Sequence, residues 1–247
     1  MEVHHHSHTS RKKWTHYLWE FLMLFLAVFS GFLAENWREH IVEHQRANIY
    51  ASSLYKELKK DTVQLNHLIT WTLDNSKRFD TLCMLASERP KGVTNGKLYY
   101  YSGFTGSSVF FSSRNSTLEQ LKSSGNLRIM NTEIALKLSD YDKSIKDLET
   151  DYTFFKTEYE TITGLRLKIF DGITSVNLFT GRDKRRDSVF QLDPPLLNDD
   201  PKLMKEFIGW VKSEANWWRS NVRDNLNPLK EQATELISLL QKEYHLE

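Results

Sequence analysis

An uncharged run of fourteen residues near the N-terminus constrains this chain more than any other feature of its sequence. Residues 21–34 read FLMLFLAVFSGFLA, and nine of the fourteen are Phe, Leu or Met. A helix of this length spans only about 21 Å, which is short of a hydrocarbon core of roughly 30 Å. Trp14 and Trp37 flank the run, and such amphipathic rings favour the membrane interface. We therefore predict a transmembrane helix over 14–37, preceded by a short cytoplasmic tail over 1–13.

Two other interpretations fit a run of this length. Such a segment can be the buried core helix of a soluble protein, although no polar face remains on this one. It can also be the apolar part of a cleavable signal peptide, with residues 11–13 as the basic region and Ser30 near the cleavage site. However, Glu20 interrupts the apolar part, and the helical pattern continues past Ser30. Both features favour an uncleaved anchor.

Basic residues on either side of the run indicate its orientation. Residues 11–13 (RKK) precede it, whereas Arg38 and Arg46 follow it among several glutamates. Segments that stay in the cytoplasm carry the excess of Lys and Arg. The count of three against two predicts a cytoplasmic N-terminus and places residues 38–247 outside the cytoplasm.

One face of the predicted membrane helix differs from the others in composition. At 100° per residue, small side chains share this face with Glu20 near one end and Arg38 near the other. The small residues on it or bordering it are Ala27, Ser30, Gly31 and Ala34. Because small residues let two membrane helices approach closely, the face is a candidate oligomerisation surface. Glu20 and Arg38 either reach the headgroups, join the oligomer contact or line a pore.

Low glycine and proline contents favour long helices for the rest of the chain. Gly accounts for 10 and Pro for 5 of the 247 residues. Apolar residues recur at alternating spacings of three and four along residues 134–162, which is the pattern of a coiled coil or a bundle seam. We predict an all-α, antiparallel bundle outside the membrane, with helices over about 38–88, 116–125, 132–172, 201–224 and 228–245.

Two local features interrupt this regular pattern. Residues 97–112 combine Gly, Ser and clustered aromatic residues, which predicts a short β-hairpin or an aromatic loop. Asp61 occupies a position where the first bundle helix should present an apolar side chain to the core. It marks either a bend where the carboxylate reaches solvent or a buried partner for a cation.

Few residue patterns point to a chemical activity. The sequence has no Gly-rich phosphate loop, paired-cysteine metal site or nucleophile elbow, so no cofactor is expected. Its single cysteine, Cys83, excludes an intrachain disulfide. The net charge of +1 argues against nucleic acid as a partner.

Two polar segments remain as candidate sites. Neutral imidazoles bind transition metals, and the N-terminus carries His4, His5, His6 and His8. A basic connector is a candidate site for lipid headgroups, because an antiparallel neighbour of the first bundle helix would bring it back to the bilayer. Its basic residues are Arg182, Lys184, Arg185 and Arg186.

Four segments of the chain carry a family resemblance. Three lie near the N-terminus, MEVHHH, WEFLMLFLAVFSGFLAENWREH and YASSLYKELKKDT, and the fourth is NSTLEQLKSSGNLRIMNTEIALKLSDY. They resemble a family of single-pass inner-membrane proteins of Gram-negative bacteria and cover less than half of the chain. The resemblance implies a native histidine-rich N-terminus and an uncleaved anchor in the inner membrane, with residues 38–247 in the periplasm. It implies no activity and no catalytic residue.

The expected function is that of a membrane-anchored, oligomeric, non-enzymatic scaffold or sensor-like domain. With a cytoplasmic tail of only about 13 residues, any signal would pass through a partner protein in the membrane. A pore subunit that uses the face with Glu20, Gly31 and Arg38 is the first alternative. A membrane-proximal enzyme is the second, and it would need a pocket of convergent polar groups.

Overall fold

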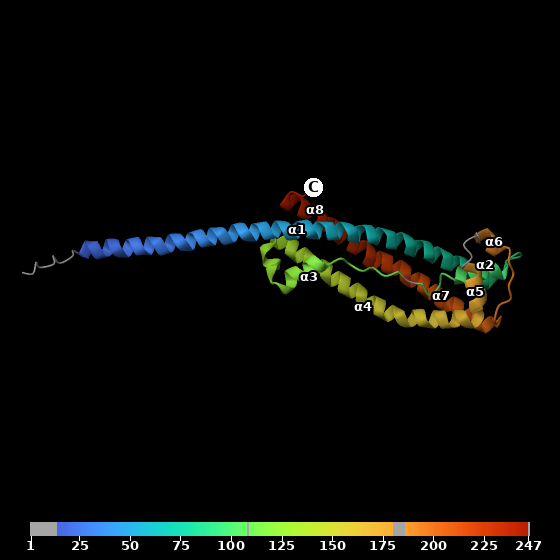
Figure 1. The fold of residues 1–247 in the computed structure, drawn as a ribbon. Coiled ribbons are helices and arrows are strands. Elements are labelled where there is room, and N and C mark those ends of the chain that lie inside the picture. The colour runs from blue at the N-terminus through green and yellow to red at the C-terminus, as the bar shows by residue number, and fades with distance from the viewer. Residues whose placement is uncertain (1–13, 108, 180–185, 247) are drawn as a thin grey trace, which may run out of the picture. The chain divides into compact units, whose positions relative to one another are not determined.

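A computed structural model describes residues 14–107, 109–179 and 186–246 (Figure 1). About 84% of the chain is helical, which confirms the all-α prediction. The chain divides into two compact units, Met1–Tyr50 and Ala51–Glu247. Helix α1 (Trp14–Glu88) contributes residues to both units.

Helix α1 joins the predicted membrane helix and the first predicted bundle helix into one element of 75 residues. It contains one glycine and no proline. Every residue in it therefore has the backbone N–H that helical hydrogen bonds require. Within the second unit its apolar series is buried, as the spacing predicts. The buried members are Ala51, Leu54, Leu58, Leu65 and Leu68.

Residues 97–112 do not form the predicted β-hairpin. Helix α2 (Asn95–Ser102) occupies the first part, and no strand occurs among the described residues. A helix places consecutive side chains 100° apart, so Tyr99 enters the core while Tyr100 and Tyr101 pack against Phe190. A strand would instead alternate them across its two faces. The loop alternative fits only the part that follows α2.

An extended return segment (residues 109–115) follows α2 and leads to α3 (Ser116–Ser123). It runs back along the bundle toward the start of α4, as Figure 1 shows. At its end, Glu57 of α1 accepts hydrogen bonds from the hydroxyls of Ser116 and Thr117, at 2.6 and 2.9 Å. The chain therefore returns along α1 without using a helix.

Helix α4 (Thr132–Ile169) runs in the same direction as α1. Near its start Tyr141 contacts Asp61, and just past its end Phe170 packs on Tyr99, which follows the end of α1. The antiparallel arrangement predicted for these two helices is wrong, because the return segment has already reversed the chain. Helix α4 also ends earlier than the predicted 172, where Phe170 adopts an extended backbone.

Three short elements complete the ends of the bundle. The 3₁₀ helix η1 (Asn126–Ile129) follows α3, while α5 (Gly172–Phe179) and α6 (Arg186–Phe190) follow α4. Residues 180–185 lie outside the described residues. Because α4 runs with α1, the flanking helices α5 and α6 lie at the end of the second unit where α1 ends (Figure 1). The prediction that the basic connector returns to the bilayer depended on an antiparallel α4. Because α4 runs parallel to α1, that support is lost.

The last part of the chain supplies the helices that run against α1 and α4. Helix α7 (Pro201–Asn221) begins as the sequence predicts, because the Asp200 side chain accepts a hydrogen bond from the Lys202 amide, and Pro201 occupies the first turn. The π-helical turn η2 (Val222–Leu226) joins it to α8 (Asn227–Tyr244). The two predicted helices, 201–224 and 228–245, are thus continuous.

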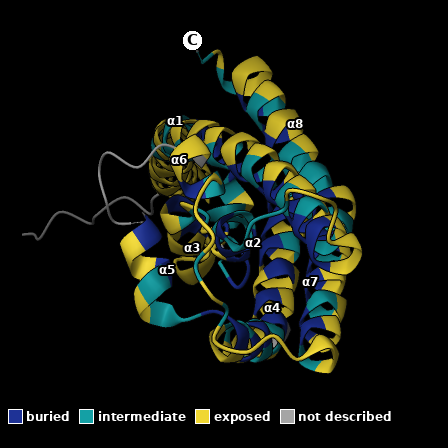
Figure 2. Cartoon of the chain, turned by 90° about the vertical axis from the view of Figure 1, so that its right-hand side faces the viewer, coloured by how far each residue is buried: buried dark blue, intermediate teal, exposed yellow. Residues whose placement is uncertain are grey.

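Aromatic packing fills the middle of the second unit. Trp218 is 1% exposed. It has ring contacts with Trp71 of α1, Phe155 of α4 and Phe110 of the return segment. Figure 2 shows buried residues along the inward faces of α4 and α7. One side chain thus joins three segments that are far apart in sequence.

Replacing Gly96 with Ala is expected to destabilise the second unit by about 1–3 kcal/mol. A Cβ at this position would lie 2.1 Å from the Val189 carbonyl oxygen and 2.4 Å from that of Leu192. The Gly96 amide also donates a hydrogen bond to the Leu192 carbonyl, so the backbones cannot separate freely. Thermal unfolding followed by circular dichroism measures the change, and Gly209→Ala provides a glycine control in α7 where an added Cβ meets no atom within 4 Å. Equal midpoints for the wild-type chain and Gly96→Ala would contradict the prediction.

Candidate functional site

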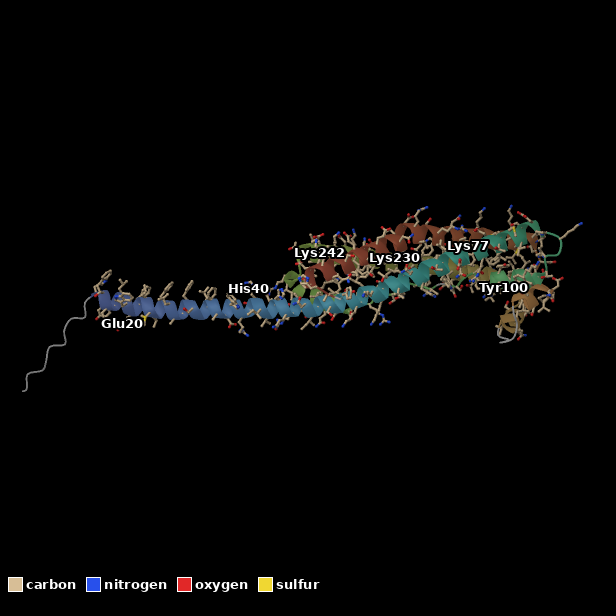
Figure 3. All side chains as sticks on the ribbon, turned by 90° about the horizontal axis from the view of Figure 1, so that it is seen from above. Glu20, His40, Lys77, Tyr100, Lys230 and Lys242 are labelled. Atoms are coloured by element: carbon tan, nitrogen blue, oxygen red, sulfur yellow. The ribbon has the colours of Figure 1, made fainter. Side chains whose placement is uncertain are left out.

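The apolar part of α1 in the first unit meets the requirements of a membrane span in length and composition. An 18-residue window of this helix is apolar enough to cross a bilayer, and none of the window is buried. Figure 3 shows Glu20 and His40 projecting from this part of α1. The helix is therefore a possible membrane span, as the sequence predicts.

Glu20 and Arg38 lie on the face of this helix that carries the small residues, and each has a polar partner one turn away. His16 Nε2 lies 3.4 Å from a carboxylate oxygen of Glu20. Arg38 donates a hydrogen bond from Nε to Glu35 at 3.0 Å. Intrahelical pairs of this kind reduce the cost of placing charged groups near an interface.

The small residues of this face are open to contact. A Cβ added at Gly31 would meet no atom within 4 Å. Ala27, Ser30 and Ala34 are likewise exposed. The predicted oligomerisation role of Ala27, Ser30, Gly31 and Ala34 stays a prediction, because the structure contains a single chain.

Most residues of the other two candidate sites lie outside the described residues. His4, His5, His6 and His8 lie outside them, as do Arg182, Lys184 and Arg185. Arg186 begins α6. Over the described ranges, no three His, Cys, Asp or Glu side chains gather as metal ligands.

Asp61 is buried, so its carboxylate does not reach solvent, and no cationic side chain pairs with it among the described residues; both interpretations of it from sequence are wrong. It is 1% exposed. Its carboxylate accepts hydrogen bonds from the Ser113 hydroxyl at 2.5 Å, the Arg114 amide at 3.0 Å and the Tyr141 hydroxyl at 2.9 Å. Burial, followed by the charge of Asp61, raises the pKa of Tyr141 well above its usual range. Asp61 therefore connects α1, the return segment and α4.

Glu214 of α7 is a second buried carboxylate and has fewer partners. It is 0% exposed. Its Oε1 accepts a hydrogen bond from the Gly106 amide at 3.3 Å, whereas its Oε2 has no hydrogen-bond partner among the described residues. Burial raises the pKa of Glu214 to about 8, and the charge of Glu158 adds to the shift. The side chain is therefore mainly protonated at pH 7.

The surroundings of Glu214 contain further unsatisfied oxygens. Thr163 Oγ1 and Glu158 Oε2, both on α4, have no hydrogen-bond partner in the described part of the chain. Gly106 has a φ of +63°, and a Cβ there would lie 2.4 Å from Thr163 Oγ1. Only glycine allows this close approach, which brings the Gly106 amide to Glu214.

Cys83 is a weak candidate for thiol chemistry. Its Sγ lies 3.9 Å from the Ile208 carbonyl oxygen. Burial raises the pKa of this thiol to about 11, and the charge of Asp80 adds to the shift. Because the thiolate is the reactive form, Cys83 is nearly unreactive at neutral pH.

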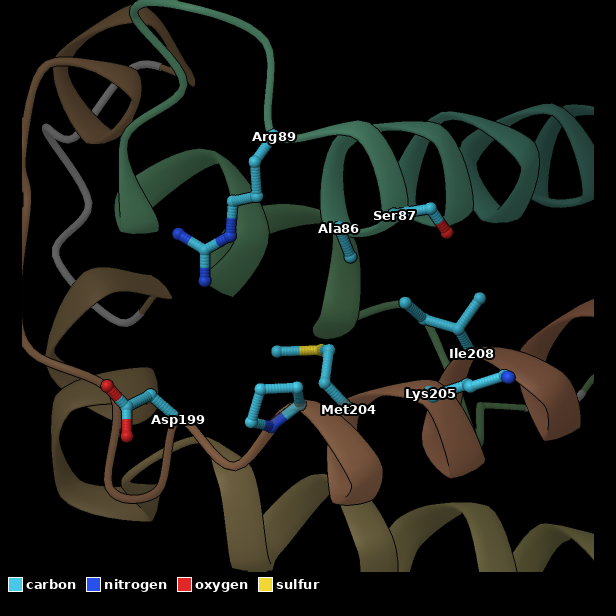
Figure 4. A pocket seen from close by; sticks show the side chains of 8 residues that line it. Ala86, Ser87, Arg89, Asp199, Met204, Lys205 and Ile208 are labelled. Atoms are coloured by element: carbon cyan, nitrogen blue, oxygen red, sulfur yellow. The ribbon is translucent and has the colours of Figure 1, made fainter.

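A cavity of about 450 Å³ lies in the second unit, between the end of α1 and the start of α7 (Figure 4). One side of its lining is apolar, and Arg89, Asp199 and Lys205 supply charged groups. In Figure 4 the Arg89 guanidinium lies beyond the end of α1, on the same side of the view as Asp199. The lining residues are Ala86, Ser87, Arg89, Asp199, Pro201, Met204, Lys205 and Ile208.

Comparison with protein-family models, curated proteins and solved structures found no match to this chain.

The burial of Glu214 can be predicted from the sequence, whereas the cavity cannot. Phe207, Val211, Glu214 and Trp218 follow spacings of four, three and four, so Glu214 occupies a seam position with a charged side chain. The cavity joins residues near 88 to residues near 205, and no local pattern connects segments so far apart.

Proposed function

We propose that this protein is a membrane-anchored, oligomeric and non-enzymatic scaffold or sensor-like domain that acts through a partner protein. One observation carries the proposal: the exposed apolar segment and a core helix of the second unit are parts of the same helix, α1. A change in how α1 packs in the second unit can thus reach the anchor along one continuous helix.

The pairing of the charged groups on the anchor favours a scaffold over a pore. A pore that uses this face would need Glu20 or Arg38 to face water. Glu20 has His16 and Arg38 has Glu35 as neighbours on the same helix. These pairs account for both residues at the interface without an aqueous channel.

The proposed location is the bacterial inner membrane, with the N-terminus in the cytoplasm and the second unit in the periplasm. The three basic residues at 11–13 support this orientation. Accessibility of a cysteine placed at the exposed position Asp140, in intact cells, tests it with a thiol reagent that does not cross the inner membrane. Labelling only after membrane disruption would contradict the periplasmic location.

Crosslinking in native membranes, followed by mass spectrometry, tests the proposed mode of action. We expect crosslinks between copies of the chain and to at least one other membrane protein. Recovery of the monomer alone, at crosslinker doses that trap a known membrane dimer, would contradict both parts of the proposal.

Replacing Gly31 with Leu is expected to reduce self-association of the full chain in a membrane reporter assay. A larger side chain on the small-residue face holds two helices apart. A loss of about 1.4 kcal/mol of association free energy lowers the association constant about tenfold, so we expect a fall in the reporter signal of up to about tenfold. Phe32→Leu changes the next residue, which faces a different side of the helix, and should leave the signal unchanged. Equal signals for Gly31→Leu and the wild-type chain would remove this face from the proposed interface.

A further inference from the structure

Three charged side chains line the cavity: Arg89 and Asp199 lie on the same side in Figure 4, and Lys205 lies on the other side, beside Ile208. Arg89 donates a hydrogen bond from Nη1 to Asn95 Oδ1 at 3.1 Å, which leaves its other nitrogens available. Asp199 lines the same cavity. Among the described residues, neither side chain forms an ion pair, either with the other or with a third residue.

The opposite side of the cavity is mainly apolar, with Ser87 and Lys205 beside the apolar residues. Ala86 comes from α1, while Met204 and Ile208 come from α7. Figure 4 shows Met204 lying between the two helices, below the Arg89 guanidinium. The volume of about 450 Å³ is near the lower end of the range for small-molecule sites, roughly 300–1,000 Å³. The cavity therefore suits a small ligand with two charges at one end and an apolar group at the other.

The backbone of Arg89 gives a second reason to assign its side chain a role. Arg89 follows the end of α1 with a φ of +43°, a left-handed conformation in which glycine is favoured and a long side chain is strained. Its side chain adds one hydrogen bond to Asn95 at the exposed end of the helix. A glycine would relieve the strain, so an arginine at this position destabilises the fold. We therefore expect the Arg89 side chain to have a functional role.

We propose that this cavity binds a free α-amino acid with an apolar side chain. Arg89 receives the α-carboxylate, because a guanidinium donates paired hydrogen bonds to a carboxylate. Asp199 accepts hydrogen bonds from the α-ammonium group. Met204, Ile208 and Ala86 cover the apolar side chain of the ligand.

The pair of opposite charges selects this class over simpler ligands. A fatty or aromatic acid without an amino group satisfies Arg89 but places its own charge close to Asp199. An amine without a carboxylate satisfies Asp199 and places its charge close to Arg89. Each of these ligands forms one charge-assisted contact fewer than an α-amino acid and is therefore expected to bind more weakly.

Isothermal titration calorimetry on the detergent-solubilised full chain tests the proposal. The probes are L-leucine and L-phenylalanine, with isovalerate and isoamylamine as the analogues that lack one charge. We expect one of the two amino acids to bind with a Kd below about 1 mM, and both analogues to bind about 10- to 100-fold more weakly.

Two variants separate ligand binding from a structural role. Arg89→Gly should weaken amino-acid binding about 10- to 100-fold while the unfolding midpoint stays equal or rises. Asp199→Asn should weaken binding of the amino acid and leave binding of isovalerate equal or stronger. Lys91→Gln, which removes a positive charge from the same exposed connection, is the control and should bind normally.

Absence of binding by both amino acids at millimolar concentration would overturn the proposal. Equal affinity in Arg89→Gly and the wild-type chain would also overturn it. Every lining residue belongs to the second unit, so the assay does not depend on a membrane or on self-association. Its failure is therefore distinguishable from failure of the proposed anchor and scaffold function.

Discussion

Replacing Glu214 with Gln is expected to stabilise the second unit at pH 8 by about 4 kcal/mol, with little effect near pH 4.5. The carboxyl has an ordinary pKa of 4.5, and burial raises it to about 8 in the folded chain. The folded state therefore binds more protons than the unfolded state between these two values. In this range the free energy of unfolding of the wild-type chain decreases as pH rises. Gln cannot ionise, so the variant does not lose this stability.

Urea unfolding of the solubilised full chain, followed by circular dichroism from pH 4.5 to 8, measures this difference. The gap between the variant and the wild-type chain should widen by about 1.4 kcal/mol per pH unit. Glu160→Gln changes an exposed carboxylate on α4 and serves as the control. A gap that stays constant over this pH range would contradict the raised pKa of Glu214.

Replacing Asp61 with Ala is expected to destabilise the second unit by about 3 kcal/mol. The variant leaves the Tyr141 hydroxyl buried without an acceptor, and it also removes the acceptor of the Ser113 hydroxyl and the Arg114 amide. The return segment then loses its central attachment to α1. Because Ser113 and Arg114 are only partly buried, water can replace part of what these two donors lose.

Chemical denaturation of three variants distinguishes the contributions. Asp61→Ala should lower the unfolding free energy most, whereas Tyr141→Phe removes one hydrogen bond to a charged acceptor and should cost about 1.5–3 kcal/mol. Asp140→Ala, an exposed neighbour on α4, is the control and should cost little. A cost of Asp61→Ala no larger than that of Asp140→Ala would show that the carboxylate does not hold these segments together.

Periodic apolar spacing makes the long helices predictable. The seam of α4 is buried as expected from Ile134 through Tyr141 to Ile162, and α7 begins at Pro201 as its start signal predicts. These features depend on residues three or four positions apart, so they can be recognised in a single segment.

Features that depend on distant segments are not predictable in this way. The parallel direction of α4 follows from the return segment, an extended passage whose length and path no helical pattern reveals. The partners of Asp61 come from residues 52 to 80 positions away. For the same reason, no sequence pattern identifies Arg89 and Asp199 as parts of one site. The hairpin predicted around the tyrosine run is wrong because consecutive aromatic residues fit a strand or a helix equally well until their contacts are known.

The parallel course of α1 and α4 also has a consequence for synthesis of the chain on the ribosome. Helix α4 packs against both α7 and α8, and α8 buries residues such as Leu236 and Leu240. These residues emerge long after α1 and α4, so apolar surface stays uncovered during most of translation. The late contacts also join segments of large sequence separation, which slows folding. A nascent chain stalled before α8 should therefore be a strong substrate for chaperones and proteases.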